Sequence, residues 1–335
     1  MSEFEDEELA QSDGDEEDQE EEHREATSDH EDHIEDCSLT QEILVPGLSL
    51  LARTGNGLSH AFVKLDLKEK SLTDIALIKS FVHLRFLDLS SNHLSDLSPL
   101  ANLTQLLWLK IDGNLVRSFR DQPVGTLPYL QWLSLAANRL RDVEGLSGSA
   151  LETLNLTGNA IQRISGIEHH RLSNLVVLEL RGNRLETTDG IFLPKLRHLY
   201  LAQNVIQRLE GLDKLERLTT LHLRDNQLET LDGINCNMKS LHYLNVRGNL
   251  IHSQRALRSL SGVAQTLRVL VLAENQLAEM DDYVACVLRH LPLLERLDKE
   301  PVTAEQKAEA EERVVQLDGE DGNEVTESSP APSNA

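Results

Sequence analysis

Residues able to carry out catalysis or to bind a metal are scarce in this sequence. It contains no glycine-rich phosphate loop, no H-E-x-x-H zinc signature and no cysteine pair at zinc-binding spacing. His169 and His170 are adjacent but lack a cluster of further ligands, so a solvated pair is the favoured interpretation. His23, His30 and His33 lie among acidic residues, where a solvated segment is favoured over a loose metal site. We therefore expect a protein that is not an enzyme, with no catalytic residues, no metal site and no cofactor.

Aromatic and arginine side chains, which dominate the energetics of protein interfaces, recur at regular intervals instead. The two tryptophans of the chain, Trp108 and Trp132, are 24 residues apart, and Phe86 lies 22 residues before the first of them. This interval is that of a repeat in the chain, and the repeat must position these side chains.

The repeat has the skeleton LxxLxLxxNxL and occurs nine times in register. One copy is LRHLYLAQNVI at 196–206, and FVKLDLKEKSL at 62–72 is a degenerate first copy with Lys70 in place of the asparagine. The nine asparagines are Asn92, Asn114, Asn138, Asn159, Asn183, Asn204, Asn226, Asn249 and Asn275. They are 21 to 26 residues apart, and a period of about 20–29 residues on this skeleton is that of leucine-rich repeats. The sequence predicts an α/β leucine-rich repeat solenoid of about nine to ten short repeats.

The spacing within each copy predicts the two sides of this solenoid. Leucines two apart, such as Leu199 and Leu201, point to one face of a short strand, and successive strands stack into a parallel concave sheet. The asparagine ends each strand, where its amide can satisfy backbone groups that the turn leaves unpaired. Apolar residues three apart then follow, as at Ile206, Leu209 and Leu212, and predict 3₁₀ and short turns on the convex side.

Non-repeat segments at both ends predict caps, because an exposed end coil would leave apolar surface open. The apolar residues of 41–61 favour a short helix over the first coil, with Gly55-Asn56-Gly57 at its end. At 278–298 an apolar helical stripe stops at Pro292. A further helix is expected at 303–317, opened by a capping box.

Charge is distributed unevenly along the chain. Residues 1–36 contain 19 Asp or Glu against one Arg, for −18, and residues 298–335 contain 11 acids and three bases, for −8. The middle of the chain, 37–297, therefore carries +2 of the total of −24. Nucleic acid is a disfavoured partner, because its recognition needs a basic footprint. The expected divisions are a disordered acidic tail at 1–40, the solenoid with its caps at 41–300, and a charged tail with a short helix at 301–335.

The cysteines favour a reducing compartment. Cys37, Cys236 and Cys286 are far apart and odd in number, unlike the paired cysteines that flank secreted repeat arrays. No apolar run reaches transmembrane length and no signal peptide opens the chain. We expect an intracellular, cytoplasmic protein without a membrane partner or a small-molecule substrate.

A protein-binding surface is the function that the pattern favours. The outward strand positions carry aromatic side chains in two groups, with arginines close to the second group, and concave sheets are the usual contact surfaces of solenoids. The alternative is that these rings only pack across neighbouring strands. The predicted partner-binding residues are Phe86, Trp108, Trp132, Arg181, His198, Tyr200, His222, Arg224, Tyr243 and Arg247.

The capping segments resemble a known family. GLSLLARTGNGLSHAFVKLDLKEKSLTDI at 47–75, and LERLDKE with the following acidic helix at 294–317, are similar to the axonemal leucine-rich repeat family of the radial spoke. The resemblance implies a non-enzymatic scaffold of the ciliary or sperm flagellar axoneme, part of the cytoskeleton, that supports motility and contacts spoke-head proteins.

A second function stays open from the sequence. The C-terminal cap also resembles that of intracellular leucine-rich repeat proteins of the phosphatase-regulator type. Such a resemblance implies a soluble regulator that holds a phosphatase or another enzyme in its concave face. An adaptor of RNA particles is disfavoured by the neutral array and the acidic tails.

The composition of the acidic tail predicts that it is dispensable for folding. Removing residues 1–36 should leave the melting temperature nearly unchanged, or raise it slightly because self-repulsion is reduced. Thermal unfolding of the full-length and shortened chains checks this, and a fall of several degrees would show that the tail stabilises the array.

Overall fold

The computed structural model describes residues 35–55, 57–164, 167 and 170–321, with backbone alone for 313–321. Most of the predicted acidic tail, together with Asn56 and His169, lies outside the described residues.

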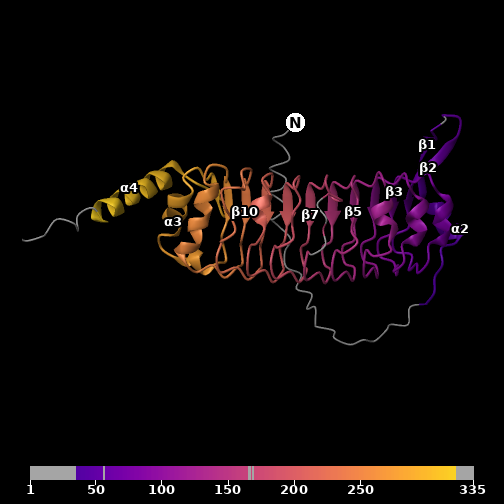
Figure 1. The fold of residues 1–335 in the computed structure, drawn as a ribbon, viewed down its shortest axis with the longest axis horizontal. Coiled ribbons are helices and arrows are strands. Elements are labelled where there is room, and N and C mark those ends of the chain that lie inside the picture. The colour runs from indigo at the N-terminus through magenta and orange to yellow at the C-terminus, as the bar shows by residue number, and fades with distance from the viewer. Residues whose placement is uncertain (1–34, 56, 165–166, 168–169, 322–335) are drawn as a thin grey trace, which may run out of the picture. The chain divides into compact units, whose positions relative to one another are not determined.

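Thirteen strands of the described chain form one sheet in strict chain order (Figure 1). From β2 to β12 neighbouring strands run parallel, whereas β1 and β13 pair antiparallel at the two ends. The strands are β1 Leu48–Arg53, β2 His60–Asp66, β3 Phe86–Asp88, β4 Trp108–Lys110, β5 Trp132–Ser134, β6 Thr153–Asn155, β7 Val177–Glu179, β8 His198–Tyr200, β9 Thr220–His222, β10 Tyr243–Asn245, β11 Val269–Val271, β12 Arg296–Leu297 and β13 Glu300–Pro301. The leucine-rich repeat solenoid predicted from the sequence is confirmed.

Leucine columns behind the sheet form a continuous core. The middle residues of neighbouring strands, for example Leu178, Leu199 and Leu221, pair in register and are buried. The predicted 3₁₀ turns on the return side are confirmed as well, and residues three apart lie above one another there. The 3₁₀ helices are η1 Ala76–Ser80, η2 Ser98–Asn102, η3 Pro123–Thr126, η4 Leu212–Lys214, η5 Gln254–Val263 and η6 Gln276–Glu279.

The repeated asparagines are buried and join each coil to the one before it. Asn204 Nδ2 donates to the carbonyls of Leu180 at 2.9 Å, Leu201 at 3.0 Å and Ala202 at 3.2 Å. Its Oδ1 accepts from the backbone N–H of Leu185 in the preceding coil, at 3.0 Å. The other eight asparagines make the same kinds of bond. The structural role predicted for these residues is therefore confirmed.

A residue in the left-handed backbone conformation precedes each of the nine repeat asparagines, a feature that the repeat skeleton did not reveal. Non-glycine residues adopt this conformation only when their surroundings hold them there. At Gln203 (φ 55°) the backbone N–H donates to the carbonyl of Arg224 in the next coil, at 2.9 Å. The left-handed residues are Ser91, Gly113, Ala137, Gly158, Gly182, Gln203, Asp225, Gly248 and Glu274.

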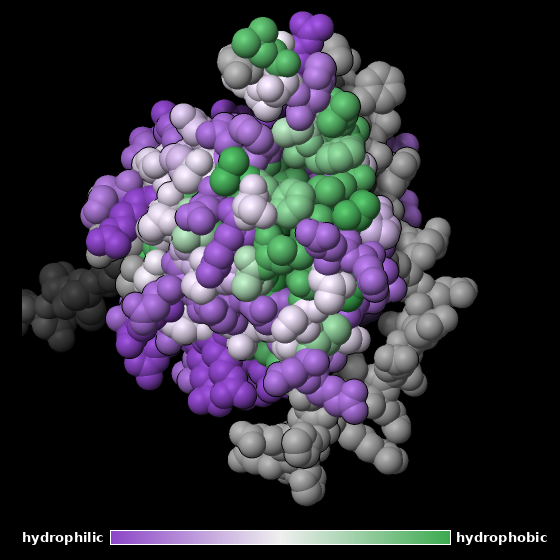
Figure 2. Space-filling view, turned by 90° about the vertical axis from the view of Figure 1, so that its right-hand side faces the viewer, coloured by the Kyte–Doolittle hydropathy of each residue, from purple (hydrophilic) through white to green (hydrophobic). Residues whose placement is uncertain are grey.

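The N-terminal cap differs from the predicted helix over 41–61. Helix α2 covers Gln41–Gly47 alone, with Thr40 as its N-cap, and the chain then forms the hairpin of β1 and β2. Pro46 lies in the last turn of α2, and proline cannot continue a helical ladder because it lacks a backbone donor. Seen from this end, apolar side chains gather in one band (Figure 2).

The C-terminal cap is built on one aspartate. Asp298 Oδ1 accepts from the backbone N–H groups of Leu272 and Ala273, both at 2.7 Å. It therefore provides a hydrogen-bond partner for two backbone donors of the last full coil. Tyr283, the first residue of helix α3 (Tyr283–His290), donates its hydroxyl to Asp298 Oδ2 at 2.9 Å. Burial, followed by the charge of Asp298, raises the pKa of Tyr283 above its usual range, so the phenol stays a donor.

Helix α4 extends over Ala304–Asp321, four residues further than predicted. The predicted capping box is present, because Gln306 N donates to Thr303 Oγ1 at 3.2 Å and Thr303 N donates to Gln306 Oε1 at 2.9 Å. The helix packs against α3 and buries Ala310.

Loss of a core leucine should destabilise the whole array, because each coil is held only by its neighbours. We expect Leu199→Ala, at a fully buried position, to lower the free energy of unfolding by about 2–5 kcal/mol. Chemical denaturation measures this, with Leu250→Ala, at a 54% exposed position, as the control. A loss below about 0.5 kcal/mol for Leu199→Ala would mean that this leucine is not in the core.

Loss of one asparagine should cost nearly as much, because several buried backbone groups lose their partner together. Asn204→Ala should lower the free energy of unfolding by at least about 2 kcal/mol. Asn102→Ala on the exposed end of η2 is the matched control and should stay within about 0.5 kcal/mol of the parent. Equal stabilities for the two variants would contradict the role assigned to the buried amides.

Candidate partner-binding site

Each short strand directs two side chains away from the core. In β8 the middle residue, Leu199, is buried, whereas the flanking residues His198 and Tyr200 are half-buried on the concave face. Because the strands pair in register, these two positions repeat as columns across the sheet. A ligand placed there would meet side chains held by a rigid backbone ladder.

The first group of predicted residues forms an aromatic patch on β3 to β5. Trp108 and Trp132 stack with ring centroids 4.7 Å apart and planes 10° apart. Phe86 pairs with Trp108 in the backbone register of the neighbouring strand. All three side chains are half-buried. The two tryptophans therefore pack across neighbouring strands, and both retain surface on the concave face.

The second group forms a line of rings on β8 to β10. The ring of His222 lies 4.9 Å from that of Tyr200 and 4.8 Å from that of Tyr243, centroid to centroid. The fourth predicted ring of this region, His198, is half-buried next to Val177 and Thr220 in the register. This line is wide enough to contact an extended segment across three coils.

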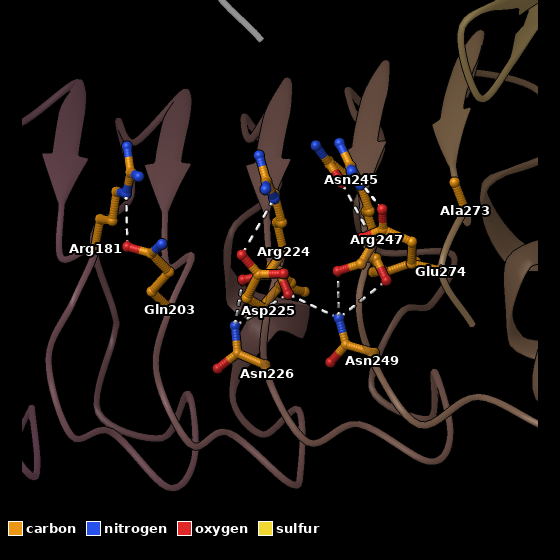
Figure 3. Close-up of polar contacts among 12 residues, drawn as sticks. Arg181, Gln203, Arg224, Asp225, Asn226, Asn245, Arg247, Asn249, Ala273 and Glu274 are labelled. Atoms are coloured by element: carbon orange, nitrogen blue, oxygen red, sulfur yellow. Dashed lines mark hydrogen bonds and ion pairs between the residues drawn. The ribbon is translucent and has the colours of Figure 1, made fainter. Parts of the chain in front are cut away.

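The predicted arginines contact neighbouring side chains (Figure 3). Arg181 Nε donates to Gln203 Oε1 at 3.0 Å, and Arg224 Nε lies 3.1 Å from Asp225 Oδ2. Arg247 pairs with Glu274, and the hydrogen bond from Arg247 lowers the pKa of that carboxyl. The charges of Arg224 and Arg247 are thus compensated by neighbouring carboxylates, whereas Arg181 contacts a neutral amide.

The two groups lie apart on the sheet. Strands β6 and β7 separate them and present Thr153, Asn155, Val177 and Glu179. The structure therefore brings the predicted residues together as two clusters, one aromatic and one of rings and compensated arginines.

Polar residues of the same columns were absent from the sequence prediction. Asp112 Oδ1 accepts from the Ser134 hydroxyl and, at 2.8 Å, from Ala136 N. Lys110 Nζ is 3.6 Å from the other oxygen of Asp112. Burial, and then the charge of Asp112, raises the pKa of Glu179. Lys110, Ser134 and Glu179 share the position of Tyr200 in their own repeats, and this register was the signal that could have revealed them.

The described part of the chain holds no group of three or more His, Cys, Asp or Glu residues arranged to hold a metal ion. His170, the described member of the predicted solvated pair, is exposed. None of the described helices is both long and apolar enough to cross a membrane.

The stacked parallel coils, the asparagine ladder and the ring-bearing concave face define a leucine-rich repeat protein, a class of scaffold for protein interaction. Models described as leucine-rich repeats match residues 83–103, 128–185 and 177–325. The chain belongs to the family of leucine-rich repeat-containing protein 23. It is 47% identical over 274 residues to the Bos taurus protein of that name, covering 82% of this chain and 79% of the relative. The Homo sapiens protein is 48% identical over 273 residues, covering 82% and 78%.

A solved structure of low sequence identity shows the same fold. The TLR13–ssRNA13 complex matches with a TM-score of 0.55 at 22% identity, over 70% of this chain and 42% of that one. At this identity the likeness concerns the architecture alone.

The pKa shift of Glu179 predicts a pH-dependent stability difference. Because burial raises the folded-state pKa above the ordinary value of 4.5, ionisation of Glu179 disfavours the folded state as the pH rises through that value. Glu179→Gln should therefore raise the free energy of unfolding near neutral pH, and the gain should vanish at a pH well below 4.5.

Glu274→Gln is the control of opposite sign. Its folded-state pKa is lowered by Arg247, so the carboxylate stabilises the fold above its ordinary pKa of 4.5 and this contribution is lost as the pH falls. Denaturation curves of both variants across pH 3–8 measure the effect. A loss of stability in Glu179→Gln at neutral pH would contradict the burial argument.

Proposed function

We propose that this protein is a non-enzymatic structural component of the radial spoke in the ciliary or sperm flagellar axoneme, where it supports motility. It binds spoke-head proteins through its concave face and belongs to the cytoskeleton of the cell. Membership of the leucine-rich repeat-containing protein 23 family supports this proposal, together with the two capping segments on which the resemblance rests.

The observation that carries the binding role is the stacked pair of tryptophans. Trp108 and Trp132 hold their rings 4.7 Å apart on two strands of one rigid sheet. Large rings fixed in this way offer apolar contact area at a low cost in conformational entropy. A partner helix or strand laid across β3 to β5 would cover them together with Phe86.

Replacing both tryptophans should weaken the capture of partners. We expect the double variant Trp108→Ala, Trp132→Ala to lose at least about 2 kcal/mol of binding free energy, which is the scale of interface hot spots. The measurement is recovery of bound proteins from ciliary extract, followed by titration of each protein that the parent chain retains. Tyr129→Ala is the matched control, because Tyr129 is 55% exposed and precedes the strand.

Melting temperatures of the variants separate binding from folding. A large fall in the melting temperature of the double tryptophan variant would show that the two rings stabilise the fold. Equal recovery of every partner by the variant and the parent would place the binding surface elsewhere. The regulator hypothesis has a separate outcome, which is co-purification of a phosphatase with the parent chain from cytosol. Retention of the tagged chain on isolated axonemes at high salt would support the proposal that the protein is a component of the radial spoke.

A further inference from the structure

The acidic residue Glu179 lies between the two clusters of the concave face without a partner of its own. It is on β7, at the strand position that Tyr200 occupies on β8, and its side chain is half-buried. Within the part of the chain that the structure describes, no residue forms a hydrogen bond or an ion pair with its carboxylate. Arg181, two residues further along, donates its Nε to Gln203 in the next coil instead (Figure 3). The concave face therefore holds a half-buried carboxylate without a paired cation.

Other carboxylates of the same face have partners. Asp88 Oδ1 accepts from the backbone N–H of Ser90 at 2.9 Å and from its hydroxyl at 2.6 Å, and Asp112 pairs with Lys110. The charge of Asp112 opposes that of Glu179, and it adds to the effect of burial in raising the pKa of Glu179. A charge that is both desolvated and unpaired destabilises the fold, and charges of this kind are typical of functional sites.

A segment that contacts both clusters must pass over this carboxylate. From the column of Trp132 on β5 to that of Tyr200 on β8 there are three strand spacings of about 4.8 Å each, which an extended chain crosses in four to five residues at about 3.3 Å per residue. The side chains that it crosses on β6 and β7 are short and uncharged, with Glu179 as the exception, and they are Thr153, Asn155 and Val177.

A cation is the complementary group for this position. An apolar side chain would complete the desolvation of Glu179 without pairing it, which is costly, and a carboxylate would add to the repulsion from Asp112. A neutral hydrogen-bond donor would leave the charge uncompensated. Arginine fits best, because its planar guanidinium binds a carboxylate through two parallel hydrogen bonds and also packs on aromatic rings. Such rings flank the position on both sides, at Trp132 and Tyr200.

We propose that the concave face binds an extended segment of a partner protein that places an arginine over Glu179 and apolar side chains on the rings at either side. The arginine supplies the cation that the chain itself does not pair with this carboxylate, so it fixes where along the array the segment lies. This inference rests on the concave-face binding proposed above and specifies the chemistry of the partner.

A synthetic peptide tests this with the full-length chain. The probe is a fluorescein-labelled nonapeptide in which leucine and serine alternate and arginine is the central residue, so that the leucines and the arginine share one side of an extended chain. Its binding is titrated by anisotropy near neutral pH. Two further peptides carry citrulline, which is neutral and nearly isosteric, or glutamate in place of the arginine. We expect saturable binding of the arginine peptide and at least about tenfold weaker binding of the other two.

Removal of the carboxylate locates the binding. Glu179→Gln should weaken the arginine peptide by at least about tenfold and leave the citrulline peptide unchanged. Glu229→Gln is the matched control, because it removes the same charge at an exposed residue outside the strands, and it should bind like the parent. Since Glu179→Gln is expected to be more stable than the parent near neutral pH, weaker binding by this variant would not reflect unfolding.

An exchange of charges distinguishes direct contact from an indirect effect. Glu179→Lys should lose the arginine peptide and bind the glutamate peptide at least about tenfold more tightly than the parent chain does. An effect of Glu179 on the shape of the sheet alone would weaken all three peptides together and would not reverse the preference for charge, so that outcome would overturn the proposal.

The double variant Trp108→Ala, Trp132→Ala separates this inference from the function proposed above. Weaker binding of the arginine peptide by the double variant, with unchanged binding by Glu179→Gln, would overturn the inference and leave concave-face binding in place. Unchanged binding by both variants would overturn both proposals. The absence of saturable binding by the parent chain, or equal affinity for the arginine and citrulline peptides, would also overturn the inference.

Discussion

Burial of backbone polar groups at the end of every strand is the constraint on which this structure depends. Each coil turns sharply inside the array, where unpaired N–H and C=O groups are costly. The asparagine amide solves this locally, as Asn204 shows by bonding three carbonyls and one N–H across two coils. Because the same side chain joins neighbouring coils, it also holds them in register, and the leucine core follows that register.

The binding face follows from the same constraint. With register held, residues at equivalent strand positions stand side by side, so Trp108 stacks on Trp132 and the ring of Tyr200 lies against that of His222. The face is therefore a set of columns whose chemistry changes along the array, from indole rings at β4 and β5 to rings with compensated arginines at β8 to β10. The side chains that a partner contacts therefore depend on which strands of the array it covers.

The ends of the array cannot use the repeat, and each end has its own solution. At the C-terminal end Asp298 replaces the missing coil by accepting two backbone N–H groups, and α3 and α4 follow it. At the N-terminal end Asn92 still accepts from Leu72, but the hairpin beyond it leaves β1 as an open edge. The two ends therefore differ, because the aspartate and two helices close one end and a β-hairpin forms the other.

The sequence by itself determined the coils, because leucine and asparagine spacing acts through contacts that recur in every repeat, as at Leu199 and Asn204. The tertiary structure decided what depends on contacts between non-equivalent residues. Pairing with β2 made Leu48–Arg53 a strand although its apolar residues suited a helix. Neighbouring coils decided that Arg247 pairs with Glu274. Burial within the columns raised the pKa of Glu179, which a pattern of spacing cannot show because burial depends on the surrounding coils.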